Sequence, residues 1–320
     1  IKKKIYLIRD RLGQKPLYYF MDKENFVFGS NLISLVQLNK NKEVNSKQIY
    51  EYLMYGIVGS PETIIKDFYK LLPSQLLEID YRNNEFALSK SIYWDLESNI
   101  DNKDFDKEEF FSIFNESVEL RANADVPVAN FLSGGLDSTA IIKNMNDNNM
   151  EINSFTIGVD NSEYDETQWA NLVSNKFNTN HKTVQISSKV SFDDIDESIS
   201  SLDEPYADPS VIPSYLISKE ISKYFKVAIS GDGGDELLGG YLRTNLTLGR
   251  SSIYSNLFSN LYSLYPGFLG TGNFFLSRNK NLEVAYGSFL EDKKFLNLLG
   301  INPDTVKKRI NLKEGLDDYK

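Results

Sequence analysis

A short apolar run followed at once by paired glycines and a helix is the feature that most constrains this sequence. Residues Val126–Leu132 read V-P-V-A-N-F-L, as a strand does, and Ser133–Ser138 follow as S-G-G-L-D-S. The residues from Thr139 to Met145 continue as the first turns of a helix. Glycines allow the backbone to turn tightly and to approach a ligand closely. A helix start offers unpaired N–H groups and a positive dipole end, so this stretch predicts a phosphate-binding loop.

The side chains of this loop indicate which kind of phosphate site to expect. Ser133 and Ser138 supply hydroxyl donors, and the carboxylate of Asp137 suits Mg²⁺ bridged to phosphate oxygens. No lysine follows the glycines, as a Walker loop would require. The stretch resembles the S-G-G-x-D-S loop of the N-type ATP pyrophosphatases, which cleave ATP between the α and β phosphates. The alternative is an ordinary glycine turn between a strand and a helix.

Strand and helix patterns alternate after the loop. Strands are expected over 152–159, 181–186 and 227–230, and helices over 167–177, 192–202 and 212–224. This alternation predicts an α/β fold with a doubly wound parallel sheet, whose ligands bind at the carboxyl ends of the strands.

A second glycine loop follows the last of these strands. Ser230–Glu236 read S-G-D-G-G-D-E and resemble the S-G-[ED]-G-[SG]-D-E motif of asparagine synthetases. Carboxylates among glycines at a strand end can hold Mg²⁺ or accept a proton. A plain acidic turn or a calcium-loop lookalike is the alternative for this loop taken alone.

Composition narrows the class of protein. The 320 residues suggest about two domains, and a net charge of −10 disfavours nucleic-acid binding. Cysteine is absent, which removes disulfides, zinc–thiolate sites and a thiol nucleophile from this chain. No apolar stretch is long enough to span a membrane. The charged stretch Asp101–Glu109 favours a domain boundary there, giving domains at 1–100 and 101–320.

The first hundred residues read mainly as β structure. Strands are expected over 5–8, 18–20, 26–28 and 76–79, and helices over 32–38 and from Ser46. Ser46 is expected to cap the second helix, which would bury Ile49, Tyr52, Leu53 and Tyr55. Arg9–Tyr19 read R-D-R-L-G-Q-K-P-L-Y-Y and resemble the last part of the class II glutamine amidotransferase domain of asparagine synthetases. Asn31 departs from the pattern, since that family usually has Glu at this position.

Together these stretches resemble the glutamine-hydrolysing asparagine synthetase family over about residues 1–245. The resemblance implies a pyrophosphate-loop ATP pyrophosphatase fold (adenine nucleotide alpha hydrolase-like), preceded by the end of an α+β N-terminal-nucleophile glutaminase domain. It further implies that the chain is the interior of a longer protein, without the start of the glutaminase domain and without a C-terminal basic segment. The implied reaction converts aspartate and ATP into β-aspartyl-AMP and pyrophosphate. Nitrogen from glutamine or ammonia then displaces AMP to give asparagine.

The resemblance also assigns site residues. Asp232 is expected as the catalytic base, Asp137 and Asp235 as ligands of Mg²⁺, and Asp10 as a contact to glutamine. The expected contacts to ATP are Leu132, Ser133, Gly134, Gly135, Asp137, Ser138, Ile157, Ser230 and Gly231. We expect a cytoplasmic enzyme of small-molecule substrates, with a homodimer as the assembly to test. The rivals are a β-lactam synthetase-like or other adenylating amidotransferase, and a catalytically silent nucleotide-binding module.

Three further features have two interpretations each. The acids of Asp203–Asp208 (D-E-P-Y-A-D) either line the mouth of the site or belong to a proline-broken connection. Asp165 is favoured as a helix cap, and His181, the only histidine, is expected to be structural. Short helices are expected over 257–268, 293–299 and 304–310.

Overall fold

The computed structural model divides into two compact units. It describes residues 4–38, 42–82, 85–100, 103–160, 165–187, 190–241 and 244. The first unit holds the described part of residues 1–102 together with Leu202–Asp208, and the second holds the described part of 103–201 and 209–248. No helix among these residues is both long and apolar enough to cross a membrane. The short helices expected beyond residue 250 lie outside the described residues.

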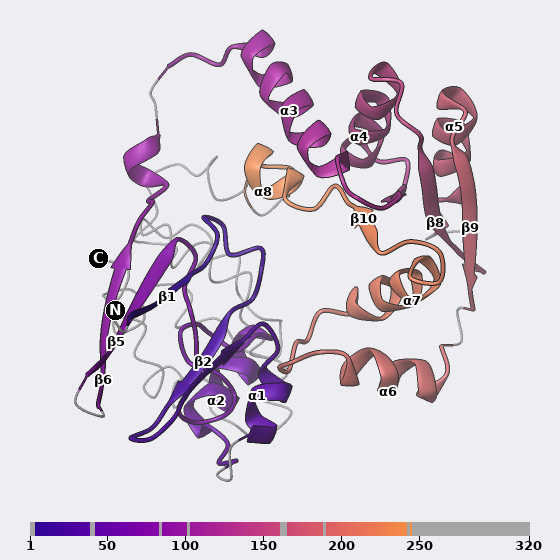
Figure 1. The fold of residues 1–320 in the computed structure, drawn as a ribbon. Helices are drawn as coiled ribbons and strands as arrows, with labels where there is room; N and C mark the ends of the chain where they lie inside the picture. Colours follow the sequence, from indigo (N-terminus) through magenta and orange to yellow (C-terminus); the bar gives the residue numbers. More distant parts are fainter. Residues whose placement is uncertain are drawn as a thin grey trace, which may run out of the picture. The chain divides into compact units, whose positions relative to one another are not determined.

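The described residues of the first unit form two antiparallel sheets and two α-helices (Figure 1). One sheet has the order β1-β5-β6 and the other has the order β3-β2-β4. Its elements are β1 (Lys4–Ile8), β2 (Tyr18–Met21), β3 (Phe26–Gly29), α1 (Leu32–Leu38), α2 (Ser46–Tyr55), β4 (Phe68–Lys70), β5 (Gln75–Arg82), β6 (Glu85–Ile92) and the 3₁₀ turn Glu97–Asn99.

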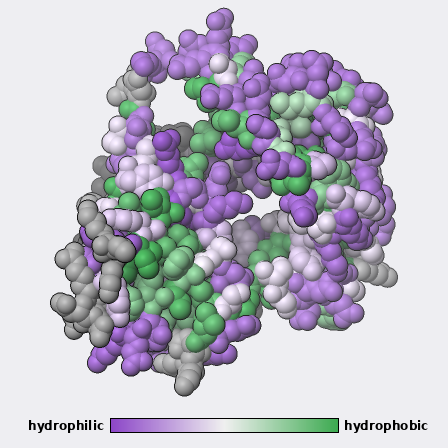
Figure 2. Space-filling model, in the orientation of Figure 1, coloured by the Kyte–Doolittle hydropathy of each residue, from purple (hydrophilic) through white to green (hydrophobic). Residues whose placement is uncertain are grey.

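Alternation along β2 gives this unit two apolar layers. Tyr19 packs with Leu7, Leu77 and Ile79 of the other sheet, so this layer lies between the sheets. Tyr18 and Phe20 point to the opposite face, where they pack with residues of α1 such as Leu32. In Figure 2, hydrophobic residues gather on the visible face of this unit in the area of β2. The arrangement is that of an α+β sandwich in which a helix covers one of two stacked sheets.

The second unit contains one parallel sheet with the order β10-β7-β8-β9. Its elements are α3 (Lys107–Ala122), β7 (Val128–Phe131), α4 (Leu136–Asp147), β8 (Asn153–Val159), α5 (Thr167–Phe177), β9 (Asn180–Ile186), α6 (Phe192–Ser200), α7 (Val211–Ile221), β10 (Val227–Ile229) and α8 (Gly234–Leu238).

Helices cover both faces of this sheet. Val128 and Leu132 pack on one face with Ile142 of α4, Val118 of α3 and Ala170 of α5. Ala129 and Phe155 pack on the other face with residues of α7, namely Ile217 and Ile221. Figure 1 shows α3, α4 and α5 on one side of the strands and α7 on the other. The doubly wound parallel fold predicted from the sequence is therefore confirmed.

The predicted cap of α2 is wrong, and its predicted buried face is only partly right, since Leu53 and Tyr55 pack half-buried around Met54. Asn45, one residue earlier than expected, caps the helix by accepting the N–H of Lys47 at 3.2 Å. The helix buries Gln48 and Met54, whereas Ile49 is 38% exposed. A polar residue can fill the buried position because the Gln48 amide donates to Glu62 at 3.1 Å. Strands β4 and β6, which the apolar pattern did not mark, complete the two sheets.

Candidate functional site

Both glycine loops leave the sheet of the second unit at neighbouring carboxyl ends. β10 pairs with β7 in parallel, with Ile229 opposite Asn130, and each loop begins within three residues of this pair. The chain runs outward from β7 through β8 to β9 and then returns to the other side of β7. The strand order therefore reverses between β7 and β10. Open α/β sheets bind their ligands at such a reversal, outside the carboxyl ends of the strands.

Gly134 sets the shape of the first loop. Its φ is +84°, a left-handed conformation that favours glycine. A Cβ at this position would lie 2.5 Å from the backbone carbonyl carbon of Trp169 and 2.8 Å from the Ala170 nitrogen. Any side chain here would therefore collide with the start of α5. Sequence reasoning did not anticipate this role for α5, because the pattern around Trp169 shows only an amphipathic helix.

Hydroxyl groups brace the same loop. Ser133 Oγ accepts the N–H of Gly135 at 3.2 Å and lies 3.2 Å from Ser138 Oγ. The Ser138 hydroxyl, which is buried, also lies 3.3 Å from the Gly135 carbonyl oxygen and donates to it. These bonds hold the loop backbone in a fixed form before a ligand arrives, which lowers the cost of ordering it on binding.

The start of α4 is open to an anion. Gly135 occupies the N-cap position, and no side chain caps the helix. The helix is 12 residues long, so its first-turn N–H groups and its dipole favour a negative charge at this end. The sequence-based prediction placed a phosphate here, and the geometry provides donors of the required kind.

Asp137 is the point at which the two loops meet. A Cβ at Gly231 would lie 2.8 Å from the Asp137 Cβ, and one at Gly234 would lie 2.7 Å from its Cγ. Both Asp137 carboxylate oxygens would be 2.9 Å from that second Cβ. Gly231 and Gly234 are thus required because the second loop lies against Asp137. The structure brings Asp137, Ser138, Ser230 and Gly231 together at the strand reversal.

Asp232 is exposed within the second loop. Its carboxylate accepts a hydrogen bond from the Ser230 hydroxyl at 2.9 Å. Gly233 follows with φ of +94° and open space around it, and it precedes the short helix α8. The hydrogen bond orients the carboxylate while leaving it accessible, which is the condition for a group that takes a proton from a substrate.

The carboxylates of the loops fit a cation that arrives with a nucleotide. Among the residues that the structure describes, no three or more His, Cys, Asp or Glu side chains form a group that could hold a metal by themselves. Asp137 lies against Gly234, whose neighbour in the chain is Asp235. Mg²⁺ is commonly held by one or two carboxylates together with phosphate oxygens and water, which suits the Asp137 carboxylate at the loop, whereas the Asp235 carboxylate lies against Gly240.

Two expected ATP contacts lie apart from each other. The Leu132 side chain is 2% exposed in the core on the α4 face, and its N–H donates to the Phe155 carbonyl oxygen at 2.8 Å. Ile157 packs with the cluster on the α7 face of the sheet. The structure therefore does not bring these two side chains together.

Two buried polar groups near the first loop were missed by sequence reasoning. Asn130 on β7 is 1% exposed, and within the described part of the chain neither atom of its amide has a hydrogen-bond partner. The Thr139 hydroxyl in the first turn of α4 is likewise buried without a partner there. Ordered water usually satisfies such groups. The signal available in the sequence was a lone amide inside an apolar strand.

Asp10, in the first unit, shapes the turn after β1. Its two carboxylate oxygens accept the N–H groups of Gln14 and Lys15, each at 2.9 Å. Desolvation raises the pKa of Asp10, but the backbone N–H groups of Lys15, Gln14 and Leu12 together outweigh it, so the pKa lies below its ordinary value. A carboxylate held ionised in this way can accept a hydrogen bond from a substrate ammonium group.

Arg9 braces the turn from the other side. Its guanidinium donates to the carbonyl oxygens of Leu71, Gly13 and Lys15 at 2.6–2.9 Å. Arg9 and Asp10 thus act together: the Arg9 guanidinium fixes the backbone of the turn, and this backbone holds the Asp10 carboxylate in position.

The two remaining single residues have structural roles. Asp165 accepts the Thr167 hydroxyl at 2.7 Å and the Thr167 N–H at 3.3 Å, so it supports the start of α5 from one residue before the N-cap. His181 Nδ1 lies 2.8 Å from the Ser154 hydroxyl on the neighbouring strand. Burial lowers the pKa of His181, which disfavours a charged imidazole.

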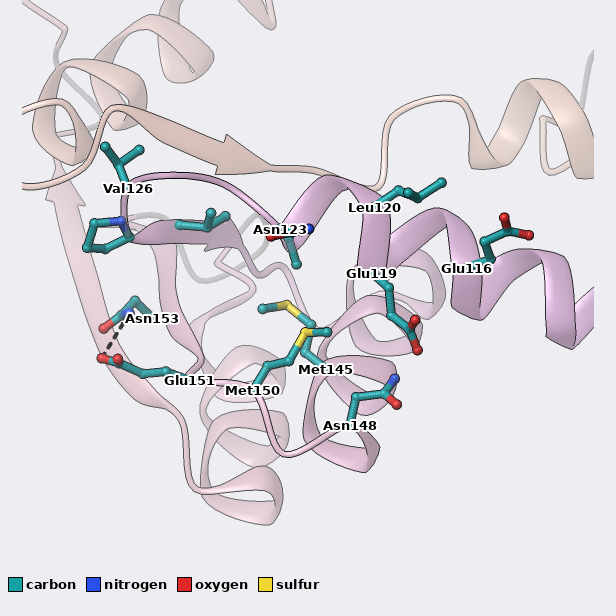
Figure 3. A pocket seen from close by; sticks show the side chains of 13 residues that line it. Glu116, Glu119, Leu120, Asn123, Val126, Met145, Asn148, Met150, Glu151 and Asn153 are labelled. Carbon is teal, nitrogen blue, oxygen red and sulfur yellow. Dashed lines mark hydrogen bonds between the residues drawn. The ribbon is translucent and has the colours of Figure 1, made fainter.

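The second unit also has a cavity of about 720 Å³, which is lined by none of the glycine-loop residues (Figure 3). Val128 and Asn153, which line it, begin strands β7 and β8. Its wall includes Met145 and Met150, and its acidic residues include Glu116 and Glu119 of α3. The cavity is therefore at the amino ends of the strands. Ligands of parallel sheets bind at the opposite edge, so the glycine loops remain the candidate site.

Comparisons with known proteins agree with this geometry. Residues 109–293 match the family model described as asparagine synthase, and residues 1–94 match that of the glutamine amidotransferase domain. A protein of Methanocaldococcus jannaschii assigned to the glutamine-hydrolysing asparagine synthetases is 36% identical over 74% of this chain and 47% of its own length. The glutamine-hydrolysing asparagine synthetase 1 of Bacillus subtilis is 28% identical, over 74% of this chain and 37% of its own.

A third relative matches more of the chain. Asparagine synthetase B of Escherichia coli, also glutamine-hydrolysing, is 27% identical over 94% of this chain and 52% of its own length. The chain thus spans about a third to a half of the curated relatives it matches. The asparagine synthase model alone covers more than half of the chain. This chain therefore belongs to the asparagine synthase family.

Proposed function

We propose that the protein converts aspartate to asparagine at the expense of ATP, through a β-aspartyl-AMP intermediate, with nitrogen from glutamine or ammonia. The observation that carries this proposal is the meeting of the two glycine loops at Asp137, on the reversal between β7 and β10. Family membership supports ligase chemistry and the use of ATP. The matched amidotransferase region supports glutamine as the nitrogen source.

In the first step, a side-chain carboxylate oxygen of aspartate attacks the α phosphorus of ATP, and the bond to the β phosphate breaks. Pyrophosphate leaves with a growing negative charge. The open N–H groups at the start of α4 and the hydroxyls of Ser133 and Ser138 would receive that charge. Gly134 and Gly135 let the backbone approach the phosphates, and Ser230 and Gly231 would contact the nucleoside.

Asp137 and Asp235 would hold Mg²⁺ with the departing phosphates, where the ion, when bound, neutralises charge on the phosphate oxygens. The remaining ATP contacts that we propose are Leu132, through its carbonyl oxygen because its N–H is donated to Phe155, and Ile157, two residues before the end of β8.

In the second step, ammonia attacks the acyl carbon of β-aspartyl-AMP, and AMP leaves with the bonding electrons. The nitrogen must lose a proton as the amide forms. The exposed carboxylate of Asp232, oriented by Ser230, is the group that we propose accepts it. Asp10 would bind the ammonium group of the glutamine that supplies the nitrogen.

We further propose a cytoplasmic enzyme whose partners are small molecules, with neither nucleic acid nor membrane among them. The net charge of −10 supports the first exclusion, since nucleic-acid binding needs a basic surface. A homodimer is the assembly we propose, which sedimentation of the full-length protein would test.

The proposed reaction is tested by incubating the full-length protein with ATP, Mg²⁺, aspartate and ammonium. Release of AMP and pyrophosphate that depends on aspartate, with asparagine formed in equal amount, supports it. AMP release that instead requires another carboxylate would make the protein a different adenylating amidotransferase. Nucleotide binding without turnover for any tested carboxylate would indicate a silent module.

A further inference from the structure

Seven residues from the middle of the chain belong to the first unit although the helices on either side belong to the second. Leu202–Asp208 lie between α6, which ends at Ser200, and α7, which begins at Val211. We call these seven residues the anchor segment. Its contacts in the first unit involve α1, the loop before β4, β4 itself and the end of α2.

Glu204 makes the most buried of these contacts. Its Oε2 lies 2.6 Å from the Lys70 ammonium, and the two side chains are only 11% and 13% exposed. Its Oε1 accepts the N–H of Ile64 at 2.9 Å. Lys70 in turn donates to the Val58 carbonyl oxygen at 2.7 Å. Both charges are thus partnered in a largely dry site, which is specific for a carboxylate and costly when one partner is removed.

Asp203 makes a second contact through Asn31. The Asn31 amide nitrogen donates to Asp203 Oδ1, while the Asn31 amide oxygen accepts the N–H of Ser34 at 2.8 Å. Asn31 therefore caps α1 with one end of its side chain and holds the anchor segment with the other. An asparagine fits this task because its amide nitrogen can donate to Asp203, whereas an aspartate could cap the helix but would repel Asp203.

Two further observations show that the anchor segment packs closely within the first unit. The Ala207 N–H donates to the Gly56 carbonyl oxygen at 2.8 Å, and a Cβ at Gly56 would lie 3.2 Å from the Ala207 Cβ. Burial raises the pKa of Tyr18 to about 12, and the negative charges of Glu204 and then Asp203 add to the effect. The acids of the anchor segment therefore face a buried phenol as well as their two polar partners.

The anchor segment is continuous in the chain with a helix that packs on the sheet of the second unit. α7 begins three residues after the anchor segment, and its Ile217 and Ile221 pack with Ala129 of β7 and Phe155 of β8. β7 is the strand that ends at the first glycine loop.

We propose that Asn31 and Lys70 are positioning residues, which hold the acidic pair Asp203–Glu204 and thereby couple nitrogen release from glutamine to amide formation. This inference rests on the proposed function. α6 and α7 are continuous in the chain with this segment, so loss of its contacts in the first unit would loosen the covalent connection between the two activities. Asparagine synthesis from free ammonia does not need the attachment, whereas synthesis from glutamine does.

The sharpest test is Asn31→Asp in the full-length protein, because Asp caps a helix as well as Asn does and only the contact to Asp203 is lost. We expect glutamine-supported asparagine formation to fall about tenfold, with excess glutamate released per asparagine, while ammonia-supported formation stays within about twofold. Faster hydrogen exchange at the Ala207 amide is expected in parallel. A second variant, Glu204→Gln, should behave in the same way, and Lys66→Met, which removes an exposed pair with Glu43, should leave all three readouts unchanged.

The outcomes separate the two levels of the proposal. Faster exchange at Ala207 with an unchanged ratio of glutamate to asparagine would overturn the coupling role. Unchanged exchange in both variants would overturn the assignment of Asn31 and Lys70 as the residues that hold the segment. A parent protein that releases no aspartate-dependent AMP would defeat the proposed function, while the exchange measurement would still report on the attachment.

Discussion

Asp137 of α4 lies so close to Gly234 of the second loop that a Cβ at Gly234 would stand 2.7 Å from the aspartate Cγ. This approach joins two motifs that are almost a hundred residues apart in the sequence. It also explains a requirement that the motif alone does not, namely why the second loop needs glycine beside Asp235. The two loops can lie this close together because Gly234 has no side chain that would collide with Asp137.

Replacing Gly234 with alanine should therefore damage the site more than the fold. The new Cβ would displace the Asp137 carboxylate, and a small misplacement of a reacting group can cost about a hundredfold in rate. We expect AMP formation to fall at least tenfold, measured as pyrophosphate release in the full-length protein. Gly233→Ala is the matched control, because a Cβ there meets open space and only the positive φ is penalised, by about 1–2 kcal/mol. Equal losses in both variants would argue against the role of the close approach.

Asp137→Asn should abolish adenylation while leaving the protein folded. The amide keeps the size of the side chain but removes the charge that we propose holds Mg²⁺. Exchange of labelled pyrophosphate into ATP, measured in the presence of aspartate, should drop by about 10²–10³. Asp147→Asn, at the far end of the same helix and paired only at the surface with Lys143, should retain normal exchange. Near-normal exchange in Asp137→Asn would remove Asp137 from the site.

Asp232→Asn should separate the two chemical steps. A base that acts on the attacking nitrogen is not needed for adenylate formation, so pyrophosphate exchange should persist while asparagine formation slows by about 10²–10⁴. Glu236→Gln alters another acid of the same loop, one that accepts the Tyr241 hydroxyl, and should keep both activities. Loss of exchange in Asp232→Asn would place the residue in the first step instead.

The buried Tyr18 hydroxyl predicts a stability change in alkali. The pKa of Tyr18 is about 12 in the folded protein against 10.0 for a free phenol. The unfolded chain releases this proton first, so the stabilisation is complete below pH 10 and is lost as the pH rises toward 12. The free energy of unfolding should fall by up to about 2 kcal/mol over this range, beyond the decrease seen for Tyr18→Phe. Denaturant titrations of both proteins would measure it, and parallel decreases would contradict the assignment.

Much of the element order could be predicted from the sequence, and particular residues show why. α1 and α5 were expected with the bounds that they have, because apolar residues recur there at helical spacing. β4 escaped notice because it has three residues, and β6 because Lys90 breaks the apolar alternation of Phe86, Leu88 and Ile92. Burial of Gln48 on α2 was not expected because the Gln48–Glu62 bond, which makes a polar residue suitable for burial, is tertiary.

The candidate site, like the fold, was predictable from the sequence only in part. The two glycine loops could be recognised from their local sequence motifs. The contact of Gly134 with Trp169 and the proximity of Gly234 to Asp137 could not, because they depend on packing. The role of Asp203 and Glu204 was open between two interpretations, and neither included their binding to Asn31 and Lys70. Their partners are more than 130 residues away in the chain, so no local pattern could reveal them. The domain division at residue 100 and the chemical roles of the site residues remain predictions.

The nucleotide product formed by the full-length protein with ATP, Mg²⁺, aspartate and ammonium tests the central claim most directly. Separation of the products by chromatography should show AMP and pyrophosphate in equal amounts, formed only when aspartate is present. ADP and phosphate as the products would mean that the glycine loops do not direct attack to the α phosphorus, and would contradict the account.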